Sequence, residues 1–317
     1  MEMIPIHSSG ALIERAIAIA REGRRKTVAV AAAQDADVIE AAAQCRAAGM
    51  IEAVLIGDEA KIRALAREHG LDLGGCEIVH MPDPGQAAHC AARLASERRA
   101  DAIMKGFLPT SALLKVVLDK AYDLRGPNTL SHCAVLDIPG YHKLLNLTDG
   151  GMVVKPEPDQ KLQILENAVR VGRALGLAPV KVAVSGATET PGEGAPQRLS
   201  DLDYVIPRAV ERFRDVVIQG PLTLDAAMSK EAAERHGMAG EVVGDADVFL
   251  VDTIEECNVV AKALVNFAGA VFAGVIVGAK APVSLVSRTD TATNKKASLA
   301  IACLLADYYA QQGVWES

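Results

Sequence analysis

The sequence has few aromatic residues and no long apolar run. Phe, Trp and Tyr make up 3% of its 317 residues, which argues against a nucleic-acid surface built on base stacking. No apolar stretch reaches the roughly 20 residues that a membrane helix needs. The first 26 residues carry an acid at position 2 and an amphipathic pattern, so we expect no signal peptide. Neither a nucleic-acid partner nor a membrane partner is therefore expected.

The sequence also lacks the motifs of several classes of cofactor-dependent protein. The six cysteines are scattered without a C-x-x-C or zinc spacing, which favours buried free thiols in a reducing, cytoplasmic location. There is no Walker A sequence and no G-x-G-x-x-G opening a helix, so a dinucleotide cofactor of the Rossmann type is not expected. No group of His, Asp, Glu and Cys has metal-ligand spacing. We therefore expect no metal site.

What is present suits a large globular core. Half of the residues are apolar and 23% are charged, so global disorder is not expected. The formal net charge is -7, which gives no overall electrostatic support to a nucleic acid or an anionic membrane. An anionic small-molecule substrate would need basic groups gathered locally.

Short β-rich runs alternate with helical patterns along most of the chain. Residues 26–33, 52–57 and 100–106 are expected strands, and Asp58 is expected to cap the helix that follows the second. This series predicts an α/β fold with mostly parallel sheets and helices on both faces. The rhythm breaks near residue 131, where 131–139 and 141–154 resemble adjacent strands of an antiparallel or crossover element.

This break suggests two domains. We expect residues 1–131 plus 286–317 to form a first α/β domain and residues 132–285 to form a second. The Gly- and Pro-rich stretch 188–197 is expected to be a loop. The last helix is expected to pack on the N-terminal sheet through Leu299, Ile301, Leu304, Leu305 and Tyr308.

The tetrapeptide Ser287-Arg288-Thr289-Asp290 stands where a buried strand gives way to a helix. A helix N-terminus offers free N–H groups and partial positive charge to an anion, and Arg288 could hold phosphate through two parallel donors. Ser287 could donate to an oxygen that gains charge during a reaction. Asp290 is either a base or the cap of the helix, and Thr289 and Thr291 are alternative caps. The alternative is an ordinary surface connection with one solvated arginine.

Other polar residues also follow apolar strands. Lys105, Asp149 and Asp252 each come at the end of such a run, and Asn258 lies one helical turn or more beyond the last of them. Strand ends of this kind line ligand-binding crevices in open α/β sheets. Lys105 could hold phosphate or a CoA diphosphate, or it could be a surface lysine. His132 is either a general acid or base or, more commonly for a lone histidine, a structural residue.

Read together and in order, these stretches resemble the phosphate acetyl/butyryltransferase family, and the butyryltransferase branch more closely. The stretches include "ADAIMKGFLPTSALLKVVLDK", "LSHCAVLDIPGYHKLLNLTDGGMVVKP" and "AGVIVGAKAPVSLVSRTD", and they cover nearly the whole chain. The resemblance implies a two-domain αβα fold of the isocitrate/isopropylmalate dehydrogenase type. It places the active site in the interdomain cleft, and homodimers are common.

The reaction that the resemblance implies is acyl-CoA plus phosphate giving acyl phosphate plus CoA. CoA is a substrate, and no metal or redox cofactor is required. In this family the arginine of the Ser-Arg pair binds phosphate and the serine stabilises the tetrahedral oxyanion. The expected catalytic residues are Ser287, Arg288, Asp290 and Asp149. The residues expected to bind phosphate or CoA are Lys105, Thr110, His132, Asn258 and Arg288.

The chain departs from the family pattern in two places that bear on activity. Where the family usually reads Pro-Asp-Ile-Glu-Ala-Gly-Asn, this chain has "DTIEECN", with Cys257 in place of glycine. The acetyltransferase branch carries a carboxylate after Ser-Arg that is thought to deprotonate CoA, and Asn294 stands at that place here. One alternative is thus an altered relative that binds CoA or acyl phosphate without turnover. A dehydrogenase of the same fold is another.

Overall fold

The computed structural model describes residues 4–186, 198–286 and 290–314. Contacts divide the chain into two compact units. Unit 1 comprises Met1–Ser8 and Asn128–Ala270, and unit 2 comprises Ser9–Pro127 and Val271–Ser317. Both units are α/β, as the sequence predicts.

Unit 2 is built on a mostly parallel sheet with the strand order β3-β2-β1-β4-β11-β10. Only β10 runs antiparallel to its neighbour β11. The central strands are Ala- and Val-rich and buried on both faces, the pattern of a covered parallel sheet. The strands are β1 (Lys26–Ala31), β2 (Ile51–Gly57), β3 (Glu77–His80), β4 (Ala102–Lys105), β10 (Val271–Val277) and β11 (Val283–Ser284).

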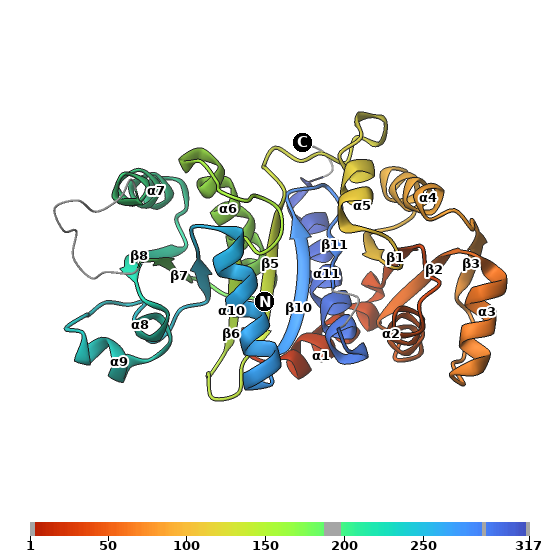
Figure 1. The fold of residues 1–317 in the computed structure, drawn as a ribbon, viewed down its shortest axis with the longest axis horizontal. Coiled ribbons are helices and arrows are strands. Elements are labelled where there is room, and N and C mark those ends of the chain that lie inside the picture. The colour runs from red at the N-terminus through yellow and green to blue at the C-terminus, as the bar shows by residue number, and fades with distance from the viewer. Residues whose placement is uncertain (1–3, 187–197, 287–289, 315–317) are drawn as a thin grey trace. The chain divides into compact units, whose positions relative to one another are not determined.

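The helices of unit 2 begin at clear sequence signals. The side chains of Asp35, Asp58 and Asp83 each accept a hydrogen bond from the third backbone N–H of the helix that follows. In Figure 1, α4 and α5 lie on one side of β1 and β2, and α2 lies on the other. The helices are α1 (Ser9–Ile19), α2 (Ala36–Ala47), α3 (Glu59–Glu68), α4 (Pro84–Ser96), α5 (Thr110–Val117) and α11 (Ala292–Gln312), with short helical turns η1 (Ala20–Arg24) and η2 (Lys120–Tyr122).

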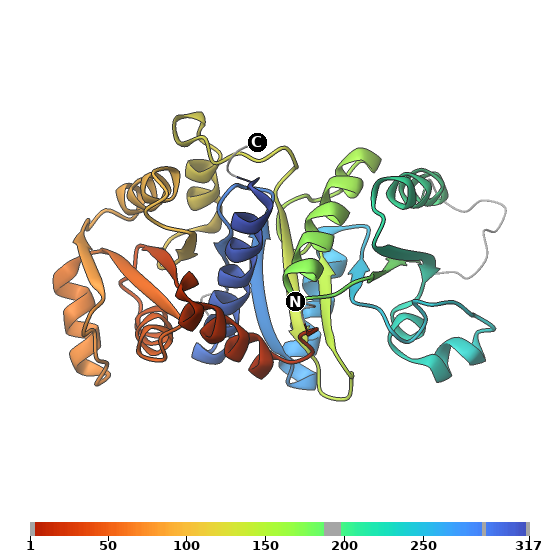
Figure 2. The same cartoon turned by 180° about the vertical axis from the view of Figure 1, so that it is seen from behind.

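The last helix, α11, is the core helix of unit 2. It packs against β10, α1 and α2, and Figure 2 shows α1 and α11 side by side. The predicted packing of this helix on the N-terminal sheet is confirmed, but one of its expected core residues is wrong. Tyr309 is fully buried, whereas Tyr308 is only half-buried. The pattern of apolar residues does not separate two adjacent tyrosines, because most of the circumference of α11 is covered.

Unit 1 has a sheet with the order β5-β6-β9-β7-β8. The predicted antiparallel element is β5 with β6, and the other neighbours are parallel. The strands are β5 (Ser131–Asp137), β6 (Leu144–Thr148), β7 (Val180–Ser185), β8 (Val216–Leu222) and β9 (Val248–Leu250). The helices are α6 (Pro158–Ala174), α7 (Arg198–Arg212), α8 (Leu224–Met228), α9 (Lys230–Arg235) and α10 (Ile254–Ala268).

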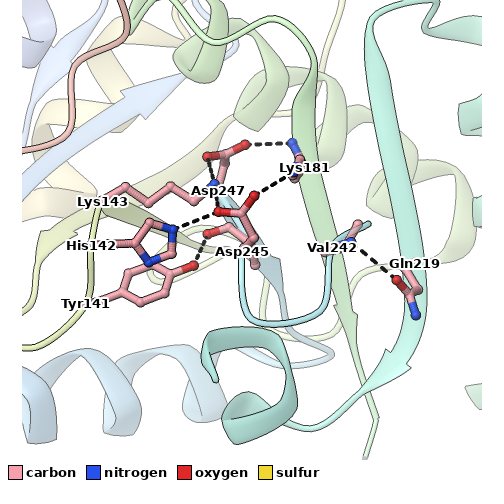
Figure 3. A network of polar contacts seen from close by, with 9 residues as sticks. Tyr141, His142, Lys143, Lys181, Gln219, Val242, Asp245 and Asp247 are labelled. Atoms are coloured by element: carbon pink, nitrogen blue, oxygen red, sulfur yellow. Dashed lines mark hydrogen bonds and ion pairs between the residues drawn. The ribbon is translucent and has the colours of Figure 1, made fainter. Parts of the chain in front are cut away.

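An ion-pair network ties the β5–β6 hairpin to the segment before β9 (Figure 3). The Lys143 ammonium lies 2.8 Å from carboxylate oxygens of both Asp245 and Asp247. His142 Nε2 lies 2.7 Å from Asp245, which also pairs with Lys181. Because Lys143 and Asp247 are almost fully buried, each needs the other as a partner.

The two units differ from the predicted domains in three stretches: residues 1–8, 128–131 and 271–285. Ile6 N donates to Leu175 O at 3.0 Å, which places the first residues with unit 1. Residues 271–285 group with the N-terminal half because β10 pairs with β11, and β11 pairs with β4. The amino-acid sequences of β10 and β11 do not indicate which sheet these two strands join. The expected loop 188–197 lies outside the described residues.

Candidate active site

The carboxyl ends of β1, β4 and β11 meet at one edge of unit 2. These strands are parallel neighbours in register, so their ends lie side by side. Lys105 is the last residue of β4 and faces Ala31, the last residue of β1. In the sequence, Ser287 and Arg288 come three and four residues after the end of β11, and they lie outside the described residues.

Lys105 is buried, with 5% of its surface exposed. Its ammonium donates to the carbonyl oxygens of Gly106 at 3.3 Å and Leu108 at 3.5 Å, so the side chain folds over the turn that leads into α5. A Cβ at Gly106 would lie 2.2 Å from Ala32 O, which explains why glycine is required there. The cation is therefore held at the start of α5 and is not a solvated surface lysine.

Thr110 is the first residue of α5, directly after this turn. The helix begins after Pro109, and no side chain caps it. Uncapped N–H groups carry partial positive charge and attract anions. The structure thus brings Lys105 and Thr110 together at a helix start, an arrangement suited to an anionic group of a substrate.

The start of α11 holds Asp290 in place. Thr291 is the N-cap, and its hydroxyl accepts from Asn294 N at 3.2 Å, which settles the choice of cap that the sequence left open. Asn294 donates its amide Nδ2 to Asp290 Oδ1 at 3.4 Å, and its Oδ1 accepts from Phe272 N at 3.2 Å. Asn294 therefore links β10 to α11.

Lys295 is a residue that the sequence reasoning missed. It is 2% exposed, and its ammonium donates to the carbonyl oxygen of Asp290 and lies 3.4 Å from Asp37 Oδ2 in the first turn of α2. A lysine among buried positions of a helix is the signal that could have identified it, because a buried charge requires partners.

In unit 1, the start of β5 and the end of β6 lie at the same edge because the two strands are antiparallel. His132 is the second residue of β5, and Asp149 follows β6 directly. The His132 backbone N–H donates to Asp149 Oδ1 at 3.0 Å. The structure therefore brings together two residues that the sequence proposed separately.

The Asp149 carboxylate organises the loop that follows β6. Besides the His132 N–H, it accepts from the backbone N–H groups of Gly151, Met152 and Val153 at 2.9–3.1 Å. Burial raises the pKa of Asp149, and these four donors act in the opposite direction. A carboxylate with four backbone donors is well suited to positioning residues 149–153. Its predicted catalytic role stays a prediction.

His132 is neutral at physiological pH in this setting. Burial lowers the pKa of its imidazole to about 4, because charging a desolvated ring is unfavourable. A neutral imidazole can exchange hydrogen bonds with a substrate but cannot attract phosphate as a cation.

Cys257 fills the space beside the Asp149 loop. It is fully buried in the first turn of α10, and a Cβ built on Gly150 would lie 2.9 Å from its Sγ and 2.9 Å from His132 Nδ1. The sulfur thus occupies room that a glycine at position 257 would leave open. Burial raises the pKa of this thiol, so it behaves as a packing residue and not as a nucleophile.

Asp252 follows β9 and pairs with Lys161 of α6 at 2.9 Å. Lys161 is another residue that the sequence reasoning missed, and it is 6% exposed. The Asp252 backbone N–H donates to Glu256 Oε2 at 3.1 Å, which secures the start of α10. Asn258 lies in the next turn and is exposed, as a residue available to a ligand must be.

Within the described parts of the chain, no group of three His, Cys, Asp or Glu side chains is placed to hold a metal ion. Within the same residues, no helix combines the length and apolarity needed to cross a bilayer.

Known proteins of one family match this chain over most of its length. It is 39% identical to a protein named probable phosphate butyryltransferase from Bacillus subtilis, over 90% of this chain and 95% of that protein. It is also 39% identical to phosphate butyryltransferase from Clostridium acetobutylicum, over 89% and 93%. The crystal structure of a branched-chain phosphotransacylase from Enterococcus faecalis superposes with a TM-score of 0.77 at 28% identity, over 89% of this chain and 99% of that one.

The family model described as phosphate acetyl/butaryl transferase matches residues 11–87 and 84–303. These ranges span both units and every described candidate residue from Lys105 to Asn294. The chain therefore belongs to the phosphate acetyl/butaryl transferase family.

Proposed function

We propose that the protein transfers a short-chain acyl group between CoA and inorganic phosphate, in the butyryl/acetyl class. The observation that carries this proposal is the family match over both units, supported by relatives named phosphate butyryltransferase at 39% identity. The substrates are acyl-CoA and phosphate, and CoA needs no further cofactor to take part.

The chemistry is a direct displacement at a thioester carbonyl. A phosphate oxygen attacks the carbonyl carbon, a tetrahedral oxyanion forms, and the C–S bond breaks to release CoA as a thiolate that takes up a proton. Positioning of the two substrates and stabilisation of the oxyanion supply most of the rate. In this scheme Arg288 binds phosphate and Ser287 donates to the oxyanion.

The described residues support roles in binding and positioning. Lys105 is a buried cation held at the start of α5, where Thr110 begins the helix, so this edge suits phosphate or a CoA diphosphate. His132 and Asn258 would exchange hydrogen bonds with substrate in unit 1. Asp290 and Asp149 remain the candidate bases, although both already accept hydrogen bonds from the chain.

The finer features that the resemblance implies belong to this proposal as well. They are the isocitrate/isopropylmalate dehydrogenase-like architecture with its interdomain cleft, a homodimer, and a cytoplasmic location. The location is supported by six free cysteines, of which five are buried.

The reaction is tested by release of free CoA thiol from acetyl-, propionyl-, butyryl- and isobutyryl-CoA, with and without phosphate. We expect phosphate-dependent release that Arg288→Ala abolishes. Removing one oxyanion donor typically costs about 10²–10³-fold in kcat, so Ser287→Ala should fall in that range. Binding of CoA without phosphate-dependent release from any of the four thioesters would reject the proposal.

Lys105 can be tested with a matched control. Lys105→Met keeps most of the length of the side chain and removes its charge. It should raise KM for phosphate or CoA by about tenfold or more, equivalent to about 1.4 kcal/mol. Lys115 lies on the same short helix but is exposed, so Lys115→Met should leave both KM values unchanged. Equal effects of the two variants would remove Lys105 from the site.

A further inference from the structure

The turn after β4 exposes an aromatic ring at the edge of unit 2 where the carboxyl ends of its parallel strands meet. Residues 102–106 and Leu108 are buried, whereas Phe107 is 47% exposed. The structure describes all five phenylalanines of the chain, and only Phe107 and Phe267 are exposed. A single exposed apolar residue is common on protein surfaces, so a role for Phe107 must be argued from how its ring is held and from what lies beside it.

The backbone of this turn is fixed on both sides of Phe107. Gly106 N donates to Ala31 O at 2.9 Å, and Phe107 N donates to Ala32 O at 2.7 Å. Ala32 has a φ of 55°, a left-handed conformation that an alanine adopts only at a cost in free energy. On the other side, Leu108 is 2% exposed and anchors the chain before α5. The ring therefore projects from a braced turn, which is the preorganisation that a binding platform needs.

A buried cation lies beneath the same turn. The Lys105 ammonium donates to the carbonyl oxygens of Gly106 at 3.3 Å and Leu108 at 3.5 Å, the two residues that flank Phe107. A positive charge and an exposed aromatic ring are thus presented within one residue of each other. Inorganic phosphate would use the charge and leave the ring without a purpose. CoA would use both, because its phosphates are bonded directly to an adenosine.

We propose that the Phe107 ring stacks on the adenine of CoA, so that the turn 105–110 binds the adenosine phosphate end of CoA and not inorganic phosphate. The inference rests on the proposed function for the identity of the substrate. It decides between the two anions that the position of Lys105 leaves open. Every base presents a flat π-face, and aromatic side chains are the platforms on which bases stack in proteins.

The remaining parts of acyl-CoA account for the ring less well. The pantetheine arm is a flexible chain with two amides, and a short acyl group must lie at the reacting thioester. Neither has a flat face that matches an aromatic ring, and either would be served as well by leucine. Adenine is also the part of CoA farthest from the thioester. Its contact with Phe107 would therefore supply binding energy from a non-reacting part of the substrate.

The first experiment places a fluorescent reporter on the turn. The chain has a single tryptophan, Trp315, so Phe107→Trp in a Trp315→Phe background reports on this position alone. Adenine stacked on an indole quenches its fluorescence. We expect saturable quenching by CoA and by adenosine 3′,5′-bisphosphate, and none by 4′-phosphopantetheine, which lacks the adenosine. Phe267→Trp in the same background is the control, and none of the three ligands should quench it. Circular dichroism checks that both variants fold.

The second experiment compares phosphate-dependent thiol release from butyryl-CoA and from butyryl-4′-phosphopantetheine. Phe107→Ala should lower kcat/KM for butyryl-CoA about tenfold, a typical loss for one stacked base, and leave kcat/KM for the truncated substrate within twofold of wild type. The KM for phosphate should not change. Phe107→Trp should keep the preference for butyryl-CoA, and Phe107→Leu, which is apolar but has no ring, should lose it. Phe267→Ala should behave as wild type.

The outcomes separate this inference from the proposed reaction. The fluorescence titration needs no phosphate and no turnover, so quenching by CoA would support the stacking even if no acyl transfer occurred. Phosphate-dependent release with equal losses of Phe107→Ala on both thioesters would leave the reaction intact and overturn the stacking. So would equal quenching by CoA and 4′-phosphopantetheine, no quenching by any of the three ligands, or a Phe107→Leu variant that keeps the preference of wild type.

Discussion

At the level of single residues, Lys295 is the buried cation whose contacts bear most directly on the Ser-Arg segment. It holds the carbonyl oxygen of Asp290, two residues after Arg288, and it reaches Asp37 in another helix. Lys295→Met removes both contacts while keeping most of the side-chain volume. Because hydrogen bonds to charged groups contribute about 1.5–3 kcal/mol, we expect looser positioning of the phosphate site.

The predicted result is a KM for phosphate raised about tenfold with a smaller change in kcat, measured by steady-state thiol release. Lys296→Met is the control, since Lys296 neighbours Lys295 but is not fully buried. A loss of stability with unchanged KM would mean that Lys295 serves the fold of unit 2 and not the site.

Asp149 offers a test that separates an anchor from a base. In Asp149→Asn the new NH₂ group must face one of the backbone N–H groups that the carboxylate now accepts from. Leaving buried donors unsatisfied costs about 1–3 kcal/mol each. We therefore expect a lower free energy of unfolding in denaturant titrations, together with lost activity. Lost activity at unchanged stability would instead assign Asp149 the role of base.

At the level of elements, the hairpin β5–β6 is fastened by the network of Figure 3. Burial alone would raise the pKa of Asp245, but hydrogen bonds from Lys143, Lys181 and His142 outweigh it and hold that pKa well below its usual value. A carboxylate whose folded-state pKa is lowered stabilises the fold above its unfolded pKa of about 3.9. That stabilisation is lost as the pH falls below this value.

Asp245→Asn should therefore lower the free energy of unfolding by about 1 kcal/mol at pH 7, since the pair is partly exposed. The difference between variant and wild type should shrink as denaturant titrations move from pH 5 to pH 2.5. Asp203→Asn, at an exposed position of α7, should show no such difference. A pH-independent effect of Asp245→Asn would point to packing and not to charge.

The helices and strands also show which features could be predicted from the sequence and which could not. Caps such as Asp58 and the alternation of apolar runs predict where the elements are, because both act within a few residues. Strand-end residues such as Lys105 and Asp149 could be named as candidates from the sequence because ligands bind at strand ends in open α/β sheets. Lys161 and Lys295 were missed because their partners, Asp252 and Asp37, are 91 and 258 residues away. Only the fold makes such pairs visible.

At the level of the whole molecule, the candidate residues are divided between the units. Lys105 and Thr110 belong to unit 2, and His132, Asp149 and Asn258 belong to unit 1. If one reaction uses both edges, substitutions in either unit must lower the same rate constant. We expect Lys105→Met and Asn258→Ala each to reduce kcat/KM for phosphate-dependent CoA release by about tenfold, about 1.4 kcal/mol of transition-state stabilisation.

Asn266→Ala is the matched control, because Asn266 is an exposed asparagine two turns further along the same helix as Asn258. The net charge of -7 makes the test sharper, since two anionic substrates must be held by a few local donors and cannot rely on the protein's overall field. The loss of any one of these donors should then lower kcat/KM measurably. Full activity of Asn258→Ala beside an inactive Lys105→Met would mean that unit 2 binds both substrates by itself, and the role assigned to the edge of unit 1 would have to be abandoned.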